Sequence, residues 1–254
     1  MSTYSILPFL ALFTLGGLLG AVGGLFGIGG GLIAIPALGL LYGMDQQLAQ
    51  GTALVMIAPN VLIGFWQYRR RAEIPLRTAL LLGMSAVLAT YAAARLATAL
   101  DAALLRRIFA AFLIGLALYF WWRLLPGRAA TAQRARLSPR WLPLVGVVGG
   151  AFSGFFSVGG GVVAAPALVG LFGQRQAAAQ GLALALVTPG ALVALAAYAH
   201  AGQVDWAAGL PLSLGGMLTI SWGVALAHRL PERRLRALFA MCLLAIALVM
   251  LVRG

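Results

Sequence analysis

The 254-residue chain is 62% apolar and 9% charged, whereas a soluble domain averages roughly 45–50% apolar and about 25% charged residues. A soluble core cannot absorb this many apolar side chains, so the composition excludes an ordinary soluble protein and predicts one embedded in a lipid bilayer. The formal net charge is +13, but the arginines form short clusters between apolar runs, which argues against nucleic-acid binding. The single cysteine excludes an internal disulfide and a cysteine metal cluster, and we expect no metal site and no cofactor.

Apolar runs along the chain predict two sets of helices joined by a basic, Pro- and Ala-rich linker. The first set has a long stretch from about 6 to 42, then helices near 47–68, 76–97 and 104–124. The second set has a stretch from about 141 to 172, then helices near 177–198, 207–228 and 234–252. The predicted organisation is an N-terminal repeat (1–125), a linker (126–140) and a C-terminal repeat (141–254).

The two sets are copies of one another. An ungapped shift of 130 residues places positions 20–68 on 150–198 with 22 identities in 49 pairs. Pro36, for example, pairs with Pro166 and Tyr68 pairs with Tyr198. A match at this level in one register indicates an internal duplication.

The long first stretch of each repeat must be broken. Its 37 residues would make a helix of roughly 55 Å, against a hydrocarbon core of about 30 Å. Glycine-rich sequence at 23–31 and 153–161 is where we expect the break, and Pro36 and Pro166 suit an early turn of a new helix. Each stretch is therefore predicted to be two short helical arms joined by a glycine-rich tip that lies in protein or lines a cavity.

The distribution of arginines favours a hairpin in each first stretch. If each stretch returns to its starting side, 14 of the 18 arginines lie on one side of the membrane, which the positive-inside rule makes cytoplasmic. Each repeat then crosses an odd number of times. The predicted fold is an all-α polytopic membrane protein with two inverted repeats of about four hydrophobic segments each, a cytoplasmic linker and both termini outside.

The glycine-rich tips are the candidate binding site for a small anion. A glycine run that leads into a helix offers unshielded N–H groups and the positive end of the helix dipole, without a buried formal charge. Two other glycine series, 16/20/24 and 146/150/154, have the spacing of close helix packing. The predicted substrate-binding residues of the tips are Gly27, Gly29, Gly30, Gly31, Ser157, Gly159, Gly160 and Gly161.

A few polar residues inside the predicted helices are further candidates for lining the path. Interhelical hydrogen bonding is the alternative interpretation for the two glutamines, and Asn60 is the most polar group expected near the middle of the bilayer. Phe26 and Phe156 occupy equivalent places in the tips and are predicted to gate them, with core packing as the alternative. The additional candidates are Gln50, Thr52, Asn60, Gln180 and Thr188.

These motifs resemble the TauE/SafE sulfite exporter family, also called the 4-toluene sulfonate uptake permeases. The likeness rests on the duplicated GxxGxGGG followed by a Pro-Ala pair, on the Gln-Gly start of the next helix and on the basic central linker. Ser157 departs from the pattern, because the first repeat has Gly27 there. The resemblance implies transport of small sulfur-containing or organic anions such as sulfite, sulfonate or sulfoacetate by a permease of the bacterial inner membrane.

Export is the expected direction, because a negative cytoplasm drives out a monovalent anion with about 2.3 kcal/mol per 100 mV. Ion-coupled uptake is the alternative within transport. An intramembrane enzyme using Ser153 and His200 is a second class, which the duplication disfavours because Gly23 replaces Ser153 in the first repeat. A non-transporting partner subunit is a third, and a homodimer stays open. We expect no enzymatic activity.

Overall fold

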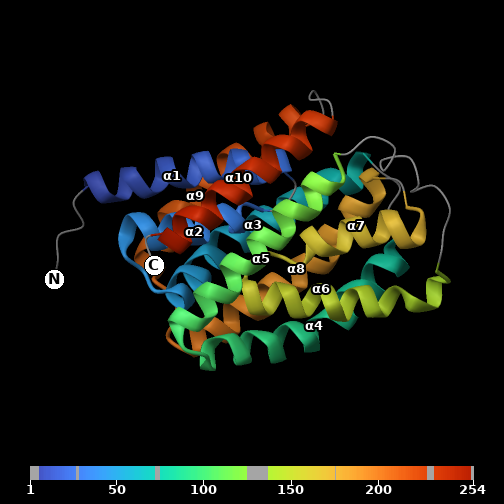
Figure 1. Ribbon diagram of the computed structural model, residues 1–254, viewed down its shortest axis with the longest axis horizontal. Coiled ribbons are helices and arrows are strands. Elements are labelled where there is room, and N and C mark those ends of the chain that lie inside the picture. Colours follow the sequence, from blue (N-terminus) through green and yellow to red (C-terminus); the bar gives the residue numbers. More distant parts are fainter. Residues whose placement is uncertain are drawn as a thin grey trace.

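A computed structural model describes residues 6–26, 29–71, 75–124, 137–174, 176–227 and 232–252. These residues form ten α-helices and one short 3-10 helix, with no strand among them (Figure 1). The first repeat contributes α1 (Ile6–Phe26), α2 (Gly31–Tyr42), α3 (Gln46–Arg71), α4 (Leu76–Ala99) and α5 (Ala102–Trp122). After the 3-10 helix η1 (Pro139–Trp141), the second contributes α6 (Leu142–Phe156), α7 (Gly161–Phe172), α8 (Gln176–His200), α9 (Trp206–Ala227) and α10 (Glu232–Val252).

The structure confirms the predicted all-helical membrane fold. In the described part of the chain, six helices are long and apolar enough to cross a membrane, by length and composition alone. Each predicted long stretch is two helices, as expected. The arms differ in length, since α1 has 21 residues while α2, α6 and α7 have 12, 15 and 12.

The burial pattern is that of a protein in lipid. Large apolar side chains point outward, such as Leu88, which is 81% exposed, and Trp222, which is 80% exposed. Polar side chains are instead enclosed, since Gln50 and Asn60 are fully buried. Apolar side chains facing outward are stable only where lipid replaces water.

The two glycine series are packing sites, as their spacing predicts. A Cβ added at Gly20 in α1 would lie 2.5 Å from Cα of Gly216 in α9, so the two backbones touch. In the other repeat Gly150 in α6 meets the backbone of Ala86 in α4 in the same way. Gly216 and Ala86 are 130 residues apart, so the two crossings are equivalent, and each joins one repeat to the other.

The directions of the helices follow from these contacts. Gly16, Gly20 and Gly24 meet Leu212, Gly216 and Ile220 in that order, so α1 and α9 are parallel. The α6 glycines meet Leu82, Ala86 and Thr90 in order, so α4 and α6 are parallel too. The equivalent helices α3 and α8 are antiparallel, because Tyr68 pairs with Gln180 and Tyr198 with Gln50.

Both glycine-rich stretches are hairpins. The backbone N–H of Leu137, just before η1, donates to the carbonyl of Leu171 near the end of α7, at 2.9 Å, so α7 returns to where α6 begins. We call this the linker end; α5 ends there at Trp122. The start of α1 and the end of α10 lie at the opposite end of the molecule, which we call the distal end (Figure 1).

Both prolines lie inside the short helices, in the second turn. Pro36 is the sixth residue of α2 and Pro166 the sixth of α7, which agrees with the early turn predicted for them. A proline there removes the N–H that would bond to the carbonyl four residues earlier.

Candidate functional site

The two glycine-rich tips meet inside the protein. A Cβ added at Gly31 would lie 3.1 Å from the carbonyl oxygen of Ser157 and 3.2 Å from Cα of Val158. Gly31 is the first residue of α2, and Ser157 and Val158 precede α7. The start of α2 therefore meets the link between α6 and α7, so the glycine-rich tips of the two repeats contact one another in the buried interior.

Neither short helix is capped by a side chain. Gly30 at the start of α2 and Gly160 at the start of α7 offer no side-chain hydrogen bond to the first turn. The Gly30 carbonyl accepts from Ile33 at 3.2 Å and from Ala34 at 3.0 Å, and the Gly160 carbonyl accepts from Val163 at 3.2 Å and from Ala164 at 2.8 Å. The N–H groups that come before these have no partner within the helix and carry the positive end of its dipole. They are suited to binding an anion.

Close packing explains several of the tip glycines. Gly30 has φ of 91°, and a Cβ there would lie 2.9 Å from the carbonyl oxygen of Leu19 in the other arm. Gly160 is equivalent, since its missing side chain makes room for the backbone of Gly149. Gly29 and Gly159 lie against valine side chains of α3 and α8. Side chains are excluded here by the fold, and binding of an anion by the backbone N–H groups stays a prediction.

The predicted residue Gly27 lies outside the described residues. The remaining predicted tip residues are brought together: Gly29, Gly30, Gly31, Ser157, Gly159 and Gly160 are buried and Gly161 is half-buried.

The two predicted glutamines form equivalent pairs with tyrosines of the other repeat. The Tyr198 hydroxyl donates to Oε1 of Gln50, and the Tyr68 hydroxyl donates to Oε1 of Gln180 at 2.7 Å. The Tyr198 hydroxyl also lies beside that of Ser157. Gln50, Tyr198 and the second tip therefore form one buried polar cluster, which we call the Tyr198 cluster.

Several buried polar atoms have no hydrogen-bond partner among the described residues. In the Tyr198 cluster these are Nε2 of Gln50 and Oγ of Ser157, which lies beside the Tyr198 hydroxyl but outside hydrogen-bond geometry. Ser153, one turn before Ser157, also has an unpaired hydroxyl, and both amide atoms of Asn60 are unpaired. An unpaired buried polar group costs about 1–3 kcal/mol, so such a concentration indicates groups that meet a ligand or water.

Asn60 is not in the Tyr198 cluster. It lies at the α1–α9 crossing, where a Cβ at Gly216 would be 2.9 Å from its Nδ2. The position equivalent to Asn60 is Gly190, and there the hydroxyls of Thr90 and Ser153 take up the corresponding space. The two repeats thus place different polar groups at equivalent crossings.

Thr52 and Thr188 have structural partners away from the tips. The hydroxyl of Thr52 accepts from the backbone N–H of Asp205 at 3.0 Å, and so holds the turn between α8 and α9. The hydroxyl of Thr188 donates to the carbonyl of Leu184 in its own helix at 2.7 Å.

The two predicted gating residues pack in aromatic clusters. Phe26 contacts Phe239 of α10, with ring centroids 4.6 Å apart, and is half-buried. Phe156 is buried and stacks on Phe112 of α5 at 4.4 Å. Both predicted interpretations, gate and core packing, agree with these positions.

Sequence reasoning missed Tyr198, Tyr68 and Phe112. A signal was present for the tyrosines, because each is repeated in register together with the glutamine that it contacts. Their pairing depends on α3 and α8 being antiparallel, which inverted repeats imply. For Phe112 there was no such signal, because its equivalent is Cys242.

The buried polar tips, the outward-facing apolar helices and the paired repeats together define a polytopic membrane transport protein. Comparison with known proteins agrees: the family model described as "Sulfite exporter TauE/SafE" matches residues 12–250. The chain therefore belongs to the TauE/SafE family of membrane transporters. It is similar to proteins named "Probable membrane transporter protein" from two strains of Xylella fastidiosa, Temecula1 and 9a5c. Each is 27% identical over 250 residues, covering 94% of this chain and 93% of the relative.

Proposed function

We propose that this protein is a permease that exports small sulfur-containing or organic anions, such as sulfite, sulfonate or sulfoacetate, from the cytoplasm. The observation that carries the proposal is the meeting of the two tips at Gly31 and Ser157, beside the unpaired Oγ of Ser157 and Nε2 of Gln50. These groups donate hydrogen bonds to an anion, and the helix dipoles add partial positive charge. A site without a formal charge binds weakly enough to release its anion.

The transport cycle proposed is alternating access, with the tips exposed to one side of the membrane and then to the other. In support, the equivalent helices α3 and α8 are antiparallel, as two repeats inverted across the membrane require. We place the linker end in the cytoplasm of a bacterial inner-membrane protein, with both termini periplasmic. The described arginines at the linker end, such as Arg69, Arg70 and Arg140, agree with the positive-inside rule.

Export needs no coupled ion in this scheme, because the membrane potential supplies the driving force. Asp45, Asp101 and Asp205 instead accept hydrogen bonds from helix N-termini, from Leu48, Leu104 and Ala208 respectively. Carboxylates with this capping role at the distal end are poorly placed to carry protons or sodium through the interior.

The test is sulfite flux in liposomes that contain only this chain. Liposomes loaded with sulfite and given a negative interior should lose it faster than empty-membrane controls, and a positive interior should retain it. Ser157→Ala should lower flux at subsaturating sulfite about tenfold, the effect of one hydrogen bond to a charged group. Thr188→Val, which removes a hydroxyl paired within its own helix, is the matched control.

The glycine variants must be chosen by packing. Gly160→Ala would collide with the backbone of Gly149, so its loss of flux would report misfolding. Gly161→Ala places its Cβ at 3.4 Å from the nearest atom, on Val187, an ordinary contact, so it perturbs the tip without unfolding it. Absence of flux in the wild-type chain, or flux that ignores both Ser157→Ala and Gly161→Ala, would refute the proposal. Flux that requires a proton or sodium gradient would replace export with coupled uptake.

A further inference from the structure

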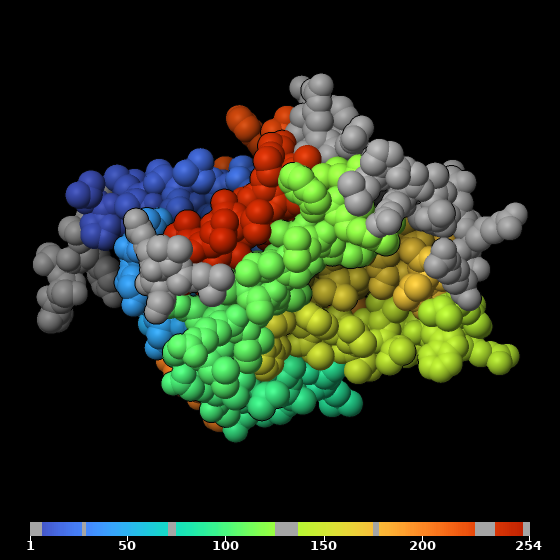
Figure 2. All heavy atoms as spheres, viewed as in Figure 1, coloured from blue at the N-terminus to red at the C-terminus, as the bar shows by residue number. Residues whose placement is uncertain are grey.

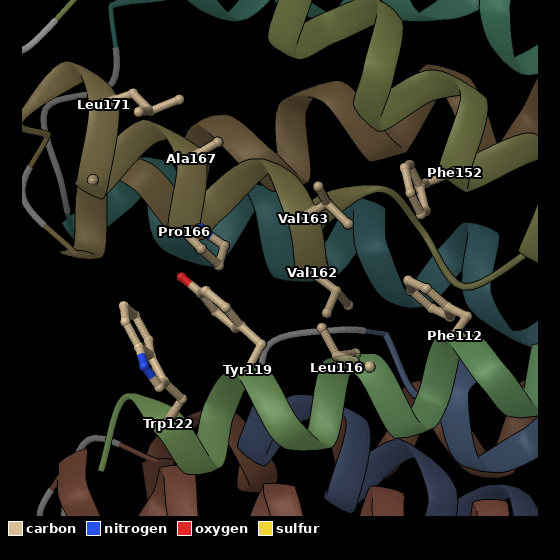
Figure 3. A pocket seen from close by; sticks show the side chains of 12 residues that line it. Phe112, Leu116, Tyr119, Trp122, Phe152, Val162, Val163, Pro166, Ala167 and Leu171 are labelled. Carbon is tan, nitrogen blue, oxygen red and sulfur yellow. The ribbon is translucent and has the colours of Figure 1, made fainter. Parts of the chain in front are cut away.

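A large cleft separates α5 from α7 near the second tip. Its volume is about 620 Å³ and its walls are apolar and aromatic side chains of α5, α6 and α7. Figure 3 shows Tyr119 and Trp122 of α5 opposite Pro166 of α7, with Phe112 and Phe152 at the other extremity. At about 30 Å³ for each water, this volume equals that of roughly twenty waters, so it is large enough for a small anion.

Aromatic rings close the inner extremity of the cleft. Phe112 and Phe152 line it, with ring centroids 5.4 Å apart. Behind them Phe156 stacks on Phe112 at 4.4 Å, with the planes only 11° apart. Phe156 directly precedes Ser157 in the second tip. The ring of Phe112 therefore lies between the cleft and the residue that leads into the Tyr198 cluster.

The outer extremity of the cleft is at the linker end. Trp122 is the last residue of α5, and Leu171 of α7 is bonded to Leu137 before η1. The guanidinium of Arg123 lies 6.0 Å from the ring of Tyr119, so a positive charge stands at this mouth. In Figure 2 the green atoms of α5 lie beside the yellow-green atoms of α6 and the gold atoms of α7 on this face of the molecule.

The other repeat is packed differently at the equivalent place. There α10 contacts α2, and the cavity beside Pro36 and Met250 measures only about 170 Å³. Cys242 and Val22 replace Phe112 and Phe152. Two repeats of similar sequence thus adopt different packing, which is what a transporter with one side open requires.

We propose that the α5–α7 cleft is the route between the linker end and the second tip, and that Phe112, stacked on Phe156, is its closed inner gate. This inference rests on the proposed anion transport and adds the path and the gating residue. Opening requires the stacked rings of Phe112 and Phe156 to separate. Closing the cleft itself would bring α5 onto α7, as α10 already lies on α2.

The test measures access to Ser157 by thiol labelling, which requires no transport. In a Cys242→Ala background, Ser157→Cys is treated with a negatively charged methanethiosulfonate in detergent. Phe112→Ala should raise the labelling rate at least tenfold. Phe120→Ala is the matched control, because that ring lies on the same helix but contacts Phe239 instead.

A second variant closes the cleft and tests the route in the opposite direction. Gly115 lines the cleft, and a Cβ there meets nothing within 4 Å, so a larger side chain can begin at this position without a backbone clash and Gly115→Trp should fill part of the cleft. It should slow labelling in the Phe112→Ala background at least tenfold. Ala245→Trp, at the equivalent exposed position of α10, should leave the rate unchanged.

The outcomes separate this inference from the proposed function. If neither Phe112→Ala nor Gly115→Trp changes the labelling rate, in a chain that transports sulfite, the gate and the route are overturned and the proposed function is not. Labelling that responds as expected, in a chain without anion flux, supports the gate and overturns the proposed substrate. If Phe112→Ala does not fold, the effect of Gly115→Trp on the Ser157→Cys rate decides alone.

Discussion

Replacing Ser157 with glycine should stabilise the protein and impair transport. Ser157 has φ of 56° and is the one non-glycine residue with positive φ in the described chain. It ends α6, where its N–H bonds to the carbonyl of Ser153 at 2.9 Å. The first repeat has Gly27 at this position. Because a serine in this conformation is strained, its presence here indicates that the hydroxyl has a function.

The magnitude follows from three terms. The left-handed conformation costs a residue with a Cβ about 1–2 kcal/mol, and the unpaired buried hydroxyl costs about 1–3 kcal/mol. Glycine in turn lowers the free energy of unfolding by about 0.5–1 kcal/mol, because its unfolded chain has greater conformational entropy. Ser157→Gly should therefore raise the free energy of unfolding by about 1–4 kcal/mol. For a chain of this size that is a rise in melting temperature of roughly 2–16 °C.

Ser157→Ala separates the two causes, because alanine loses the hydroxyl but keeps the backbone strain. In thermal melts of the detergent-solubilised proteins, followed by tryptophan fluorescence, the Ser157→Gly variant should be more stable than the Ser157→Ala variant by about 1 kcal/mol. Sulfite flux should fall in both variants. A glycine variant that is less stable than the alanine variant would refute the strain argument. Full flux in both would refute the role of the hydroxyl.

Two further changes test the packing that holds the tips. Gly20→Ala should lower the free energy of unfolding by about 1–3 kcal/mol, because its Cβ would push α1 away from Gly216. The control is Gly17→Ala, whose Cβ would lie 3.6 Å from its nearest neighbour and which should melt like the wild type. An equal loss of stability in both variants would contradict this explanation. Tyr198→Phe should lower the free energy of unfolding by about 1–3 kcal/mol, because it leaves Oε1 of Gln50 unpaired. In a double-mutant cycle, adding Gln50→Leu should recover part of that stability. Strictly additive losses of stability would show that the two side chains do not interact.

The helices were predictable from sequence because lipid imposes simple limits. A span needs about 20 apolar residues, and connections are marked by charge, so predicted and observed helices such as 76–97 and Leu76–Ala99 differ by a few residues. The duplication predicted the equivalence of the two hairpins. Glycine spacing predicted which faces of α1 and α6 pack closely, but not that α9 and α4 are their partners.

The site was predictable only where it lies within one segment. The tips were found because glycine-rich sequence next to a helix has a direct structural meaning. Thr52 was a candidate by polarity alone, and its hydrogen bond to Asp205 depends on where the α8–α9 turn lies. Phe112 belongs to the site through contact between α5 and α6, and no local pattern marks such a contact. The different packing of the two repeats cannot be inferred from a sequence that makes them equivalent.

Because α1 and α6 each pack on a helix of the other repeat, the order of synthesis affects when these contacts can form. Gly216 follows Gly20 by 196 residues, so at about 5–20 residues per second α9 is synthesised roughly 10–40 s after the helix that it must contact. Gly146 follows Leu82 by only 64 residues, so α4 and α6 can pair within roughly 3–13 s. Helices α4 and α6 can thus pair while the chain is still being synthesised, whereas the glycine face of α1 stays uncovered in the membrane until nearly the whole chain has been made.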